Sequence, residues 1–216
     1  EYNRKMLILD RPNPNGHYVD GPILDMKYKS SVGWLPIPIV HGMTLGELAL
    51  MVNGERWLPA SRICDITVIK CKNYTHQTMY ELPIPPSPNL PNMKAVYLYP
   101  STCYFEATPV SLGRGTQLPF QIYGHPNMLG YDYTFTPQSI PGAKNPPQLN
   151  RICHGVNLSE LSNEEIWKKG VDLSYLIDAY RNLNMDDYFF RPFFELLTGR
   201  DYVRKMIKQG KNADEI

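Results

Sequence analysis

The sequence has little net charge and no long apolar run. Its 22 Lys and Arg residues nearly balance its 21 Asp and Glu residues, which leaves a formal net charge of +1. This balance supplies no positive field that could hold nucleic acid or an anionic membrane surface. No stretch approaches the roughly 20 apolar residues that a membrane-spanning helix needs. We therefore expect no nucleic-acid partner and no membrane span, and a ligand that is recognised by local contacts.

Several motifs of common enzyme classes are also absent. The four cysteines form no C-x-x-C pair, so a zinc site built from thiolates is not expected. There is no G-x-S-x-G, no H-E-x-x-H, no G-x-G-x-x-G and no P-loop. These absences argue against a serine hydrolase, a zinc protease and an ordinary nucleotide-binding protein. We expect no cofactor and no metal ion.

Proline and tyrosine, in contrast, are abundant. The chain of 216 residues contains 20 Pro and 15 Tyr, a composition that favours ordered loops carrying amphipathic rings. Residues 81–91, ELPIPPSPNLP, contain too many prolines for a helix or a strand. We predict a stiff loop there, and loops of this kind often line binding clefts.

The start of the chain predicts a strand in an unusual place. Residues Met6 to Leu9 form a short apolar run typical of a parallel strand that is buried on both faces. Such a strand needs neighbours and is rarely the first element of a doubly wound sheet. Because the sequence also begins with Glu1 rather than Met, we expect that sequence upstream of it is missing.

Further elements follow from capping and periodicity. Thr44 and Glu47 form a capping box that predicts a helix start, with a stop at Asn53 and Gly54. A β-branched run predicts a strand at residues 64–71. Apolar periodicity predicts helices in the last part of the chain. We infer an α/β fold with a first domain over residues 1–126 and a smaller α+β domain over residues 127–216.

The first candidate site is the segment Asp10-Arg11-Pro12-Asn13, which follows the predicted first strand. In open α/β sheets the ligand crevice lies beyond the carboxyl ends of the strands. A carboxylate, a guanidinium and an amide in that position can bind sugar hydroxyls or a ligand carboxylate. The alternative is an ordinary turn in which Asp10 bonds to the local backbone and Arg11 clamps the surface.

Two more candidates combine loops with functional side chains. His41 precedes the capped helix, where the positive end of the helix dipole favours a neutral imidazole, although a lone histidine is more often structural. Glu106 is accompanied by Arg114, which two glycines flank, so the backbone there can approach a ligand closely. Asp10 and Glu106 are available for acid–base chemistry at a glycosidic bond.

Five segments, in this order and spacing, carry a resemblance to a known family. They are LDRPNPNGHYVDGPILD, HGMTLGELA, PSPNLPNM, YPSTCYFEAT and SLGRGT. Together they resemble the NamZ-type exo-β-N-acetylmuramidases, formerly a domain of unknown function. The resemblance implies a Rossmann-like parallel-sheet catalytic domain, of which this chain holds the C-terminal part, joined to a smaller C-terminal domain. It also implies an exported protein of the periplasm or cell envelope.

The resemblance further implies a reaction and the residues for it. The substrates are peptidoglycan-derived saccharides of N-acetylmuramic acid and N-acetylglucosamine, from which terminal β-1,4-linked N-acetylmuramic acid is released. The resemblance implies catalytic roles for Glu106, His41 and Asp10. Substrate-binding roles pass to the following residues: Arg11, Asn13, Asn89 and Arg114.

One departure from the family pattern bears on the activity of the chain. The family carries an upstream G-P-E-H-G motif whose glutamate is its acid/base, and the motif does not occur in these 216 residues. Two other hypotheses therefore stay open. One is a cell-wall sugar-binding module without activity, and a weaker one is a nucleotide-dependent Rossmann enzyme.

Overall fold

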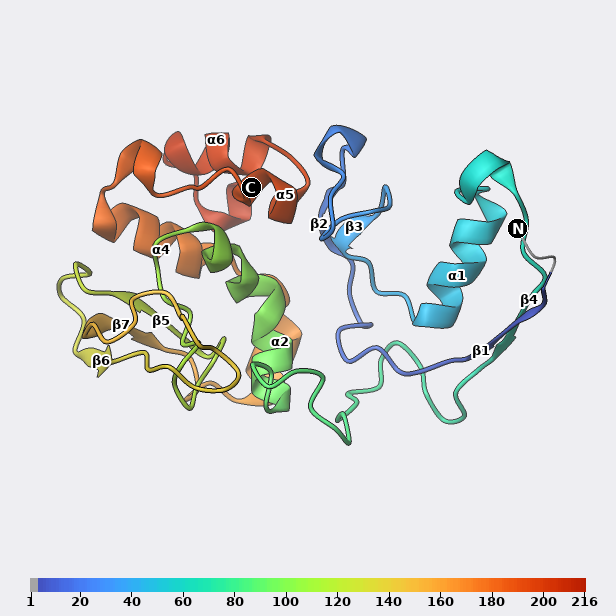
Figure 1. Cartoon of the computed structure of the whole chain (residues 1–216), viewed down its shortest axis with the longest axis horizontal. Coiled ribbons are helices and arrows are strands. Elements are labelled where there is room, and N and C mark those ends of the chain that lie inside the picture. Colours follow the sequence, from blue (N-terminus) through green and yellow to red (C-terminus); the bar gives the residue numbers. More distant parts are fainter. Residues whose placement is uncertain (1–3) are drawn as a thin grey trace. The chain divides into compact units, whose positions relative to one another are not determined.

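Figure 1 shows a computed structural model of the chain, in which residues 4–216 are described. These residues form two compact units. Among the described residues, the first unit comprises residues 4–19 and Val40–Glu81, and the second comprises Asp20–Ile39 and Leu82–Ile216. The predicted boundary between residues 126 and 127 falls inside the second unit.

The first unit is built around one parallel strand pair. Strand β1 (Met6–Leu9) pairs with β4 (Ile66–Ile69) in the register Met6↔Ile66 to Leu9↔Ile69. Parallel strands need a crossover connection, and helix α1 (Leu45–Gly54) lies in the connection here. The predicted capping box is confirmed, because the Thr44 hydroxyl accepts from Glu47 N and the Glu47 carboxylate accepts from Thr44 N.

The predicted burial of the first strand is wrong for the described residues. Met6, Leu7 and Leu9 are 52%, 63% and 67% exposed, respectively, although the strand itself is present. The reason is that β1 pairs with β4 alone among residues 4–216. An apolar run in sequence predicted a central strand, but within residues 4–216 only β4 pairs with β1.

The second unit combines small sheets with a set of helices. Strands β5 (Ile122–His125), β7 (Cys153–Asn157) and β6 (Tyr133–Phe135) form an antiparallel sheet in the order β5-β7-β6. Strands β2 (Asp20–Ile23) and β3 (Pro38–Val40) form a separate pair. The α-helices are α2 (Met93–Thr102), α3 (Asn163–Lys169), α4 (Ser174–Leu183), α5 (Phe194–Thr198) and α6 (Tyr202–Lys208). Short 3₁₀ turns are η1 (Met26–Tyr28), η3 (Cys103–Ala107), η4 (Asp186–Tyr188) and η5 (Ala213–Glu215), and the first unit contains η2 (Pro59–Ser61).

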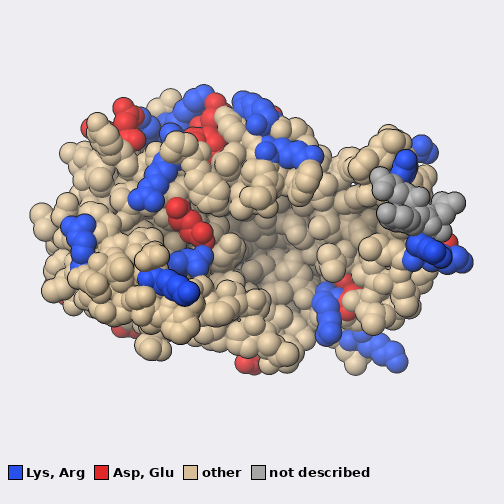
Figure 2. Space-filling model, viewed as in Figure 1, with Lys and Arg blue, Asp and Glu red and all other residues tan. Residues whose placement is uncertain are grey.

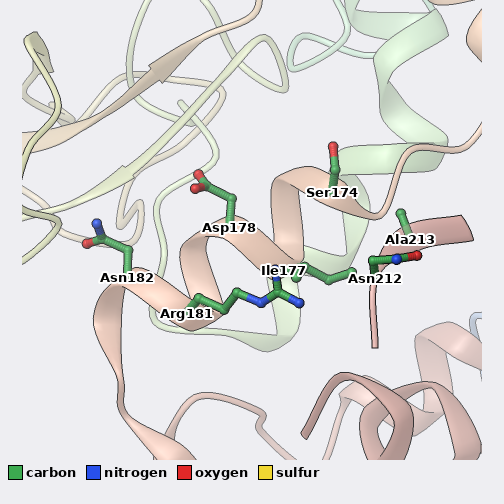
Figure 3. A pocket seen from close by; sticks show the side chains of 7 residues that line it. All are labelled: Ser174, Ile177, Asp178, Arg181, Asn182, Asn212 and Ala213. Atoms are coloured by element: carbon green, nitrogen blue, oxygen red, sulfur yellow. The ribbon is translucent and has the colours of Figure 1, made fainter. Parts of the chain in front are cut away.

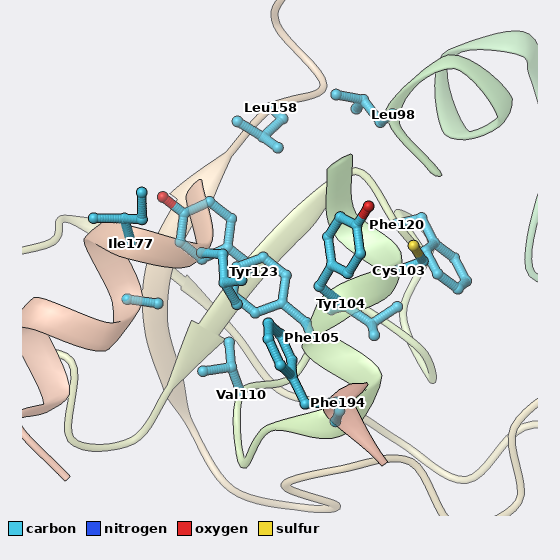
Figure 4. Close-up of a cluster of buried hydrophobic side chains, with 14 of the residues drawn as sticks. Leu98, Cys103, Tyr104, Phe105, Val110, Phe120, Tyr123, Leu158, Ile177 and Phe194 are labelled. Carbon is cyan, nitrogen blue, oxygen red and sulfur yellow. The ribbon is translucent and has the colours of Figure 1, made fainter. Parts of the chain in front are cut away.

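The main core lies in the second unit and is rich in aromatic rings. Figure 4 shows Phe105 and Tyr123 at its centre, and their rings stack with centroids 4.9 Å apart. Phe105 and Phe194 are fully buried. Rings of this size each bury about 150–250 Å², so a few of them supply much of the apolar burial. This core fixes η3, the turn that carries Glu106.

Prolines had the predicted effect in one segment and a weaker effect in another. Residues 81–91 form no helix or regular strand, as predicted. Helix α2 includes Pro100 and ends two residues later, at Thr102. A proline so close to the carboxyl end disturbs only the last turn, and the chain then continues as η3.

Candidate active site

Asp10 stands directly after β1 and binds the first turn of α1. Its carboxylate accepts hydrogen bonds from the Thr44 hydroxyl at 2.7 Å, from Gly46 N at 2.8 Å and from Arg11 N at 2.9 Å. Gly46 has to be a glycine for this, because a Cβ there would lie 2.5 Å from Val68 and 2.9 Å from Asp10. The carboxylate is thus held at the carboxyl edge of the strand pair.

These contacts also fix the charge of Asp10. Partial burial raises the pKa of Asp10, but the hydrogen bonds from Thr44, Gly46 and Arg11 outweigh it and hold the pKa below its ordinary value. Asp10 is therefore an anion at neutral pH. An anion can act as a base or stabilise positive charge, but it cannot donate a proton.

Asn13 is held in the turn that follows. Its side-chain amide donates to Met43 O at 2.9 Å, and its Oδ1 accepts from Asn15 N at 2.9 Å. The Tyr74 hydroxyl contacts both the backbone N and the backbone O of Asn13, at 3.1 and 3.0 Å. Arg11, in contrast, has an exposed side chain.

His41 follows β3 and is half-buried. Its Nδ1 accepts a hydrogen bond from Met43 N at 3.1 Å, so in the neutral ring the proton resides on Nε2. Burial lowers the pKa of His41 below its ordinary value. The sequence also predicted a neutral imidazole at His41, but from the helix dipole. In the structure the pKa of His41 is lowered by burial of the ring. His41 can therefore donate a hydrogen bond from Nε2 to a ligand oxygen.

A cavity of about 190 Å³ lies at this edge of the first unit. Asp10, Glu47, Lys70, Tyr74 and His76 are among the residues that line it. From the sequence, Glu47 was expected only in the capping box of α1, and His76 was not among the candidate residues. The position of His76 in the loop after the predicted strand at residues 64–71 could have marked it as a candidate, because loops that follow parallel strands meet at one edge of the sheet.

Glu106 and Arg114 form an ion pair in the second unit. The Arg114 guanidinium donates to Glu106 Oε1 at 3.1 Å, and both side chains are 29% exposed. The guanidinium carbon of Arg114 also lies 4.9 Å from the centre of the Phe120 ring, within cation–π range. The two residues that the sequence singled out as one candidate cluster are thus direct partners.

The glycines beside Arg114 are required by the backbone. Gly113 and Gly115 have φ of +83° and +81°, values that side chains rarely tolerate. A Cβ at Gly113 would lie 2.5 Å from Leu118 O, and one at Gly115 would lie 2.4 Å from Gln138 O. The turn therefore presents Arg114 from a tightly packed backbone.

The remaining candidate, Asn89, bonds within its own unit. Its side-chain amide donates to Gly142 O at 2.9 Å, and its backbone N donates to the Ser87 hydroxyl at 3.2 Å. The candidates therefore divide into two groups. Asp10, Arg11, Asn13 and His41 lie in the first unit, whereas Asn89, Glu106 and Arg114 lie in the second.

A hollow beside α4 in the second unit, drawn in Figure 3, contains none of these candidates. Its polar groups are bound by the protein itself. Asp178 accepts from the hydroxyls of Tyr123 and Tyr131, both at 2.7 Å, and Asn182 exchanges two hydrogen bonds with the backbone of Leu129. Because the nearby side chains serve the fold in this way, we assign no ligand to this hollow.

Charges and possible metal ligands are dispersed. On the face shown in Figure 2, Lys and Arg side chains are scattered and interspersed with Asp and Glu. Within residues 4–216, no group of three His, Cys, Asp or Glu side chains is arranged to hold a metal ion. None of the helices described is long and apolar enough to cross a membrane.

Comparison with known proteins identifies the family. Residues 1–94 match the family described as exo-beta-N-acetylmuramidase NamZ, N-terminal, and residues 97–216 match its C-terminal counterpart. Over 228 aligned residues, which cover 97% of this chain, it is 35% identical to the peptidoglycan beta-N-acetylmuramidase NamZ of Bacillus subtilis (strain 168). The chain belongs to the NamZ family. It covers 54% of the Bacillus protein, so it spans about half the length of this curated relative.

Two crystal structures from Bacteroides fragilis NCTC 9343, both described as DUF1343 family proteins, resemble this NamZ-family chain. One is 84% identical with a TM-score of 0.98, and the match covers 99% of this chain and 61% of that chain. The other is 24% identical with a TM-score of 0.73, covering 96% and 59%, and it shows the fold alone. The family predicted from the motifs is confirmed, and so is the predicted α/β class: the described residues form a small parallel sheet and an antiparallel sheet.

Proposed function

We propose that this protein acts as an exo-β-N-acetylmuramidase. It releases terminal β-1,4-linked N-acetylmuramic acid from the non-reducing ends of peptidoglycan fragments during cell-wall turnover. The observation that carries the proposal is the 35% identity to the Bacillus NamZ protein over 97% of this chain. We further propose that the first unit belongs to a Rossmann-like sheet and that the protein acts outside the cytoplasm, at the cell envelope.

The geometry of the candidate residues supports particular roles. The Asp10 anion suits a base or a stabiliser of positive charge at the sugar ring. The neutral His41 can donate from Nε2 to a sugar oxygen. We propose that the acid/base is the glutamate of the family's G-P-E-H-G segment, and that Glu106 holds Arg114 in place for the substrate.

Arg114 is the proposed determinant of muramic acid specificity. The lactyl group of muramic acid carries a carboxylate, and a planar guanidinium binds a carboxylate through two parallel hydrogen bonds. One nitrogen of Arg114 already donates to Glu106. The guanidinium has five N–H donors, so others remain for a ligand.

A non-catalytic sugar-binding module is the second candidate. The observation that favours it is the engagement of Asp10, which accepts three hydrogen bonds from its own chain. The two functions differ in one simple measurement. We expect the protein encoded by the whole gene to release the chromophore from a chromogenic muramide. If that protein binds the muramide but does not cleave it, the sugar-binding module is favoured.

The specificity test replaces Arg114. For Arg114→Ala in the whole-gene protein, we expect kcat/KM on a muramic acid glycoside to fall on the order of a hundredfold, equivalent to about 3 kcal/mol. Cleavage of the matching glucosaminide, which lacks the lactyl carboxylate, should change little. Arg114→Lys should recover only part of the loss, because an ammonium cannot form the two parallel bonds.

Arg151→Ala is the matched control for this experiment. Arg151 is an exposed arginine of the same unit whose guanidinium donates to Gln148 at 2.8 Å. Arg151→Ala should leave kcat/KM unchanged on both the muramic acid glycoside and the glucosaminide. An equal loss on the muramide and the glucosaminide in Arg114→Ala would refute the assignment of Arg114 to the lactyl carboxylate.

A further inference from the structure

His76 lies on the loop that follows β4 and has no role in the proposed reaction. Its ring nitrogens contact two different segments of the first unit. Nδ1 lies 2.8 Å from the backbone oxygen of Gly16, and Nε2 lies 3.1 Å from Glu47 Oε1. Gly16 belongs to the loop after β1, and Glu47 belongs to the first turn of α1. One ring therefore joins two residues, Gly16 and Glu47, that are 31 positions apart in the sequence.

Both atoms that face the ring are hydrogen-bond acceptors. A backbone carbonyl and a carboxylate carry no hydrogen, so each requires an N–H from the imidazole. A neutral imidazole has only one N–H, and its other nitrogen would then turn a lone pair towards an oxygen lone pair at 2.8 or 3.1 Å. Only the imidazolium satisfies both contacts. We infer that His76 is a positively charged positioning residue that ties the loop after β1 to the first turn of α1.

The two segments that His76 joins carry the candidate residues of the first unit. Gly16 N donates to Asn13 O at 3.0 Å and closes the turn that contains Asn13. The second carboxylate oxygen of Glu47 accepts from Thr44 N at 2.9 Å, and the Thr44 hydroxyl donates to Asp10. Movement of the His76 ring would therefore be transmitted to both Asn13 and Asp10.

The charges around the ring agree with this assignment. Glu47 from α1 and Asp10 after β1 are negative, Lys70 at the end of β4 is positive, and Tyr74 lies on the same loop. The hydrogen bond to Glu47, and after it the bond to Gly16, raises the pKa of His76 above its ordinary value of 6.5. Burial raises the pKa of Glu47, but the hydrogen bonds from Thr44 and His76 outweigh it and lower that pKa.

The direction of these shifts sets the pH dependence of the contact. Because the folded-state pKa of His76 is raised, its contribution to stability is fully present below pH 6.5 and is lost as pH rises through the folded-state pKa. The side chains of His76 and Glu47 are 45% and 44% exposed, so solvent screens their attraction. The contact should act on the local order of the two loops more than on global unfolding.

The charge of His76 is measured directly by ¹⁵N NMR of the histidine-labelled chain during a pH titration. We expect both nitrogens of His76 to stay protonated to a higher pH than those of His41 and His125, whose pKa values burial lowers. Glu47→Gln removes the negative acceptor and should shift the titration of His76 to lower pH. A neutral His76 throughout the titration, or no response to Glu47→Gln, would overturn the inference.

The positioning role of His76 is tested by amide hydrogen exchange in the two segments that it joins, the loop after β1 and the first turn of α1. His76→Gln, which carries no positive charge, should increase amide hydrogen exchange at Gly16 and Thr44 at low pH and remove its dependence on pH near the His76 titration. His154→Gln, in the other unit, is the matched control and should change neither. Unchanged exchange in His76→Gln would contradict a positioning role.

A third measurement, of enzyme activity, rests on the proposed function. In the whole-gene protein, His76→Gln should lower kcat on a muramide by up to about a hundredfold and remove the alkaline limb that His76 adds to the pH profile. Absence of turnover in every variant, the unsubstituted protein included, would refute the muramidase proposal. The NMR and exchange measurements need no substrate, so they decide the state of His76 independently.

Discussion

Gly113 decides the shape of the turn that presents Arg114. In Gly113→Ala the new methyl group would meet Leu118 O at 2.5 Å on a backbone with φ of +83°. We expect a loss of about 1–3 kcal/mol from the strained backbone and a further loss of similar size from overpacking. Urea unfolding followed by circular dichroism measures it.

Gly130→Ala separates the two causes. Gly130 has φ of +85°, but nothing lies within 4 Å of a Cβ placed there. It should show the cost of the backbone alone, about 1 kcal/mol. If Gly130→Ala and Gly113→Ala were equally destabilising, the close approach of a Cβ at position 113 to Leu118 O would contribute nothing to the loss.

Residue types and loop positions in the sequence were sufficient to select Asp10, Asn13 and His41 as candidates. Their contacts were not predictable, because Asn13 meets Met43 and Asp10 meets Thr44 only when separate loops converge at one edge of the strand pair. His76 was missed for the same reason. The role inferred for His76 depends on two hydrogen-bond acceptors, Glu47 and Gly16, which lie 29 and 60 positions away in the sequence.

At the scale of elements, the capping boxes of the α-helices α1 and α3 provide a matched pair for a prediction. Thr44 caps α1 and Ser162 caps α3, each with a glutamate three residues later. The Thr44 hydroxyl also donates to Asp10 at 2.7 Å, and Thr44 is buried. We expect Ser162→Ala to cost about 1 kcal/mol and Thr44→Ala about 2 kcal/mol. Amide hydrogen exchange within each helix measures the two losses separately.

Asp10 supplies a second readout of the same change. In Thr44→Ala the carboxylate loses one of the hydrogen bonds that hold its pKa low, so its pKa should rise. An NMR titration of the Asp10 carboxyl carbon follows this, with Ser162→Ala as the control that leaves it unchanged. A lower pKa for Asp10 in Thr44→Ala would show that the hydroxyl does not donate to the carboxylate.

Elements with local signals were predictable from sequence, and elements held by distant partners were not. The capping boxes of α1 and α3 act within four residues, so the sequence contains the whole signal. Strand β6 has three residues in a Pro- and Gly-rich stretch and exists because it pairs with β7, about 20 residues later. The exposure of β1 likewise depended on how many neighbours it has, which its own apolar run does not specify.

At the scale of the whole molecule, the chain crosses between its two compact units three times, because each unit is assembled from separate segments. Residues 20–39 leave the first unit after β1 and join the second before α1 begins in the first. The predicted boundary between residues 126 and 127 assumes that each domain is one continuous segment, whereas both compact units are discontinuous. A local sequence signal does not show that a chain returns to an earlier unit, so the discontinuous division was not predictable from local patterns.

The exposed side of the first unit predicts how the whole chain behaves in solution. Met6, Leu7 and Leu9 are exposed on β1, whose backbone pairs on one side only within residues 4–216. A strand edge with apolar side chains favours pairing with another copy. We expect concentration-dependent self-association in analytical ultracentrifugation, and we expect Leu7→Lys to shift the chain towards the monomer by placing a charge on that edge. Leu129→Lys, at a residue of the second unit that is 77% exposed, should leave association unchanged. Equal effects of the two substitutions would indicate a general response to added charge and would exclude β1 as the surface of contact.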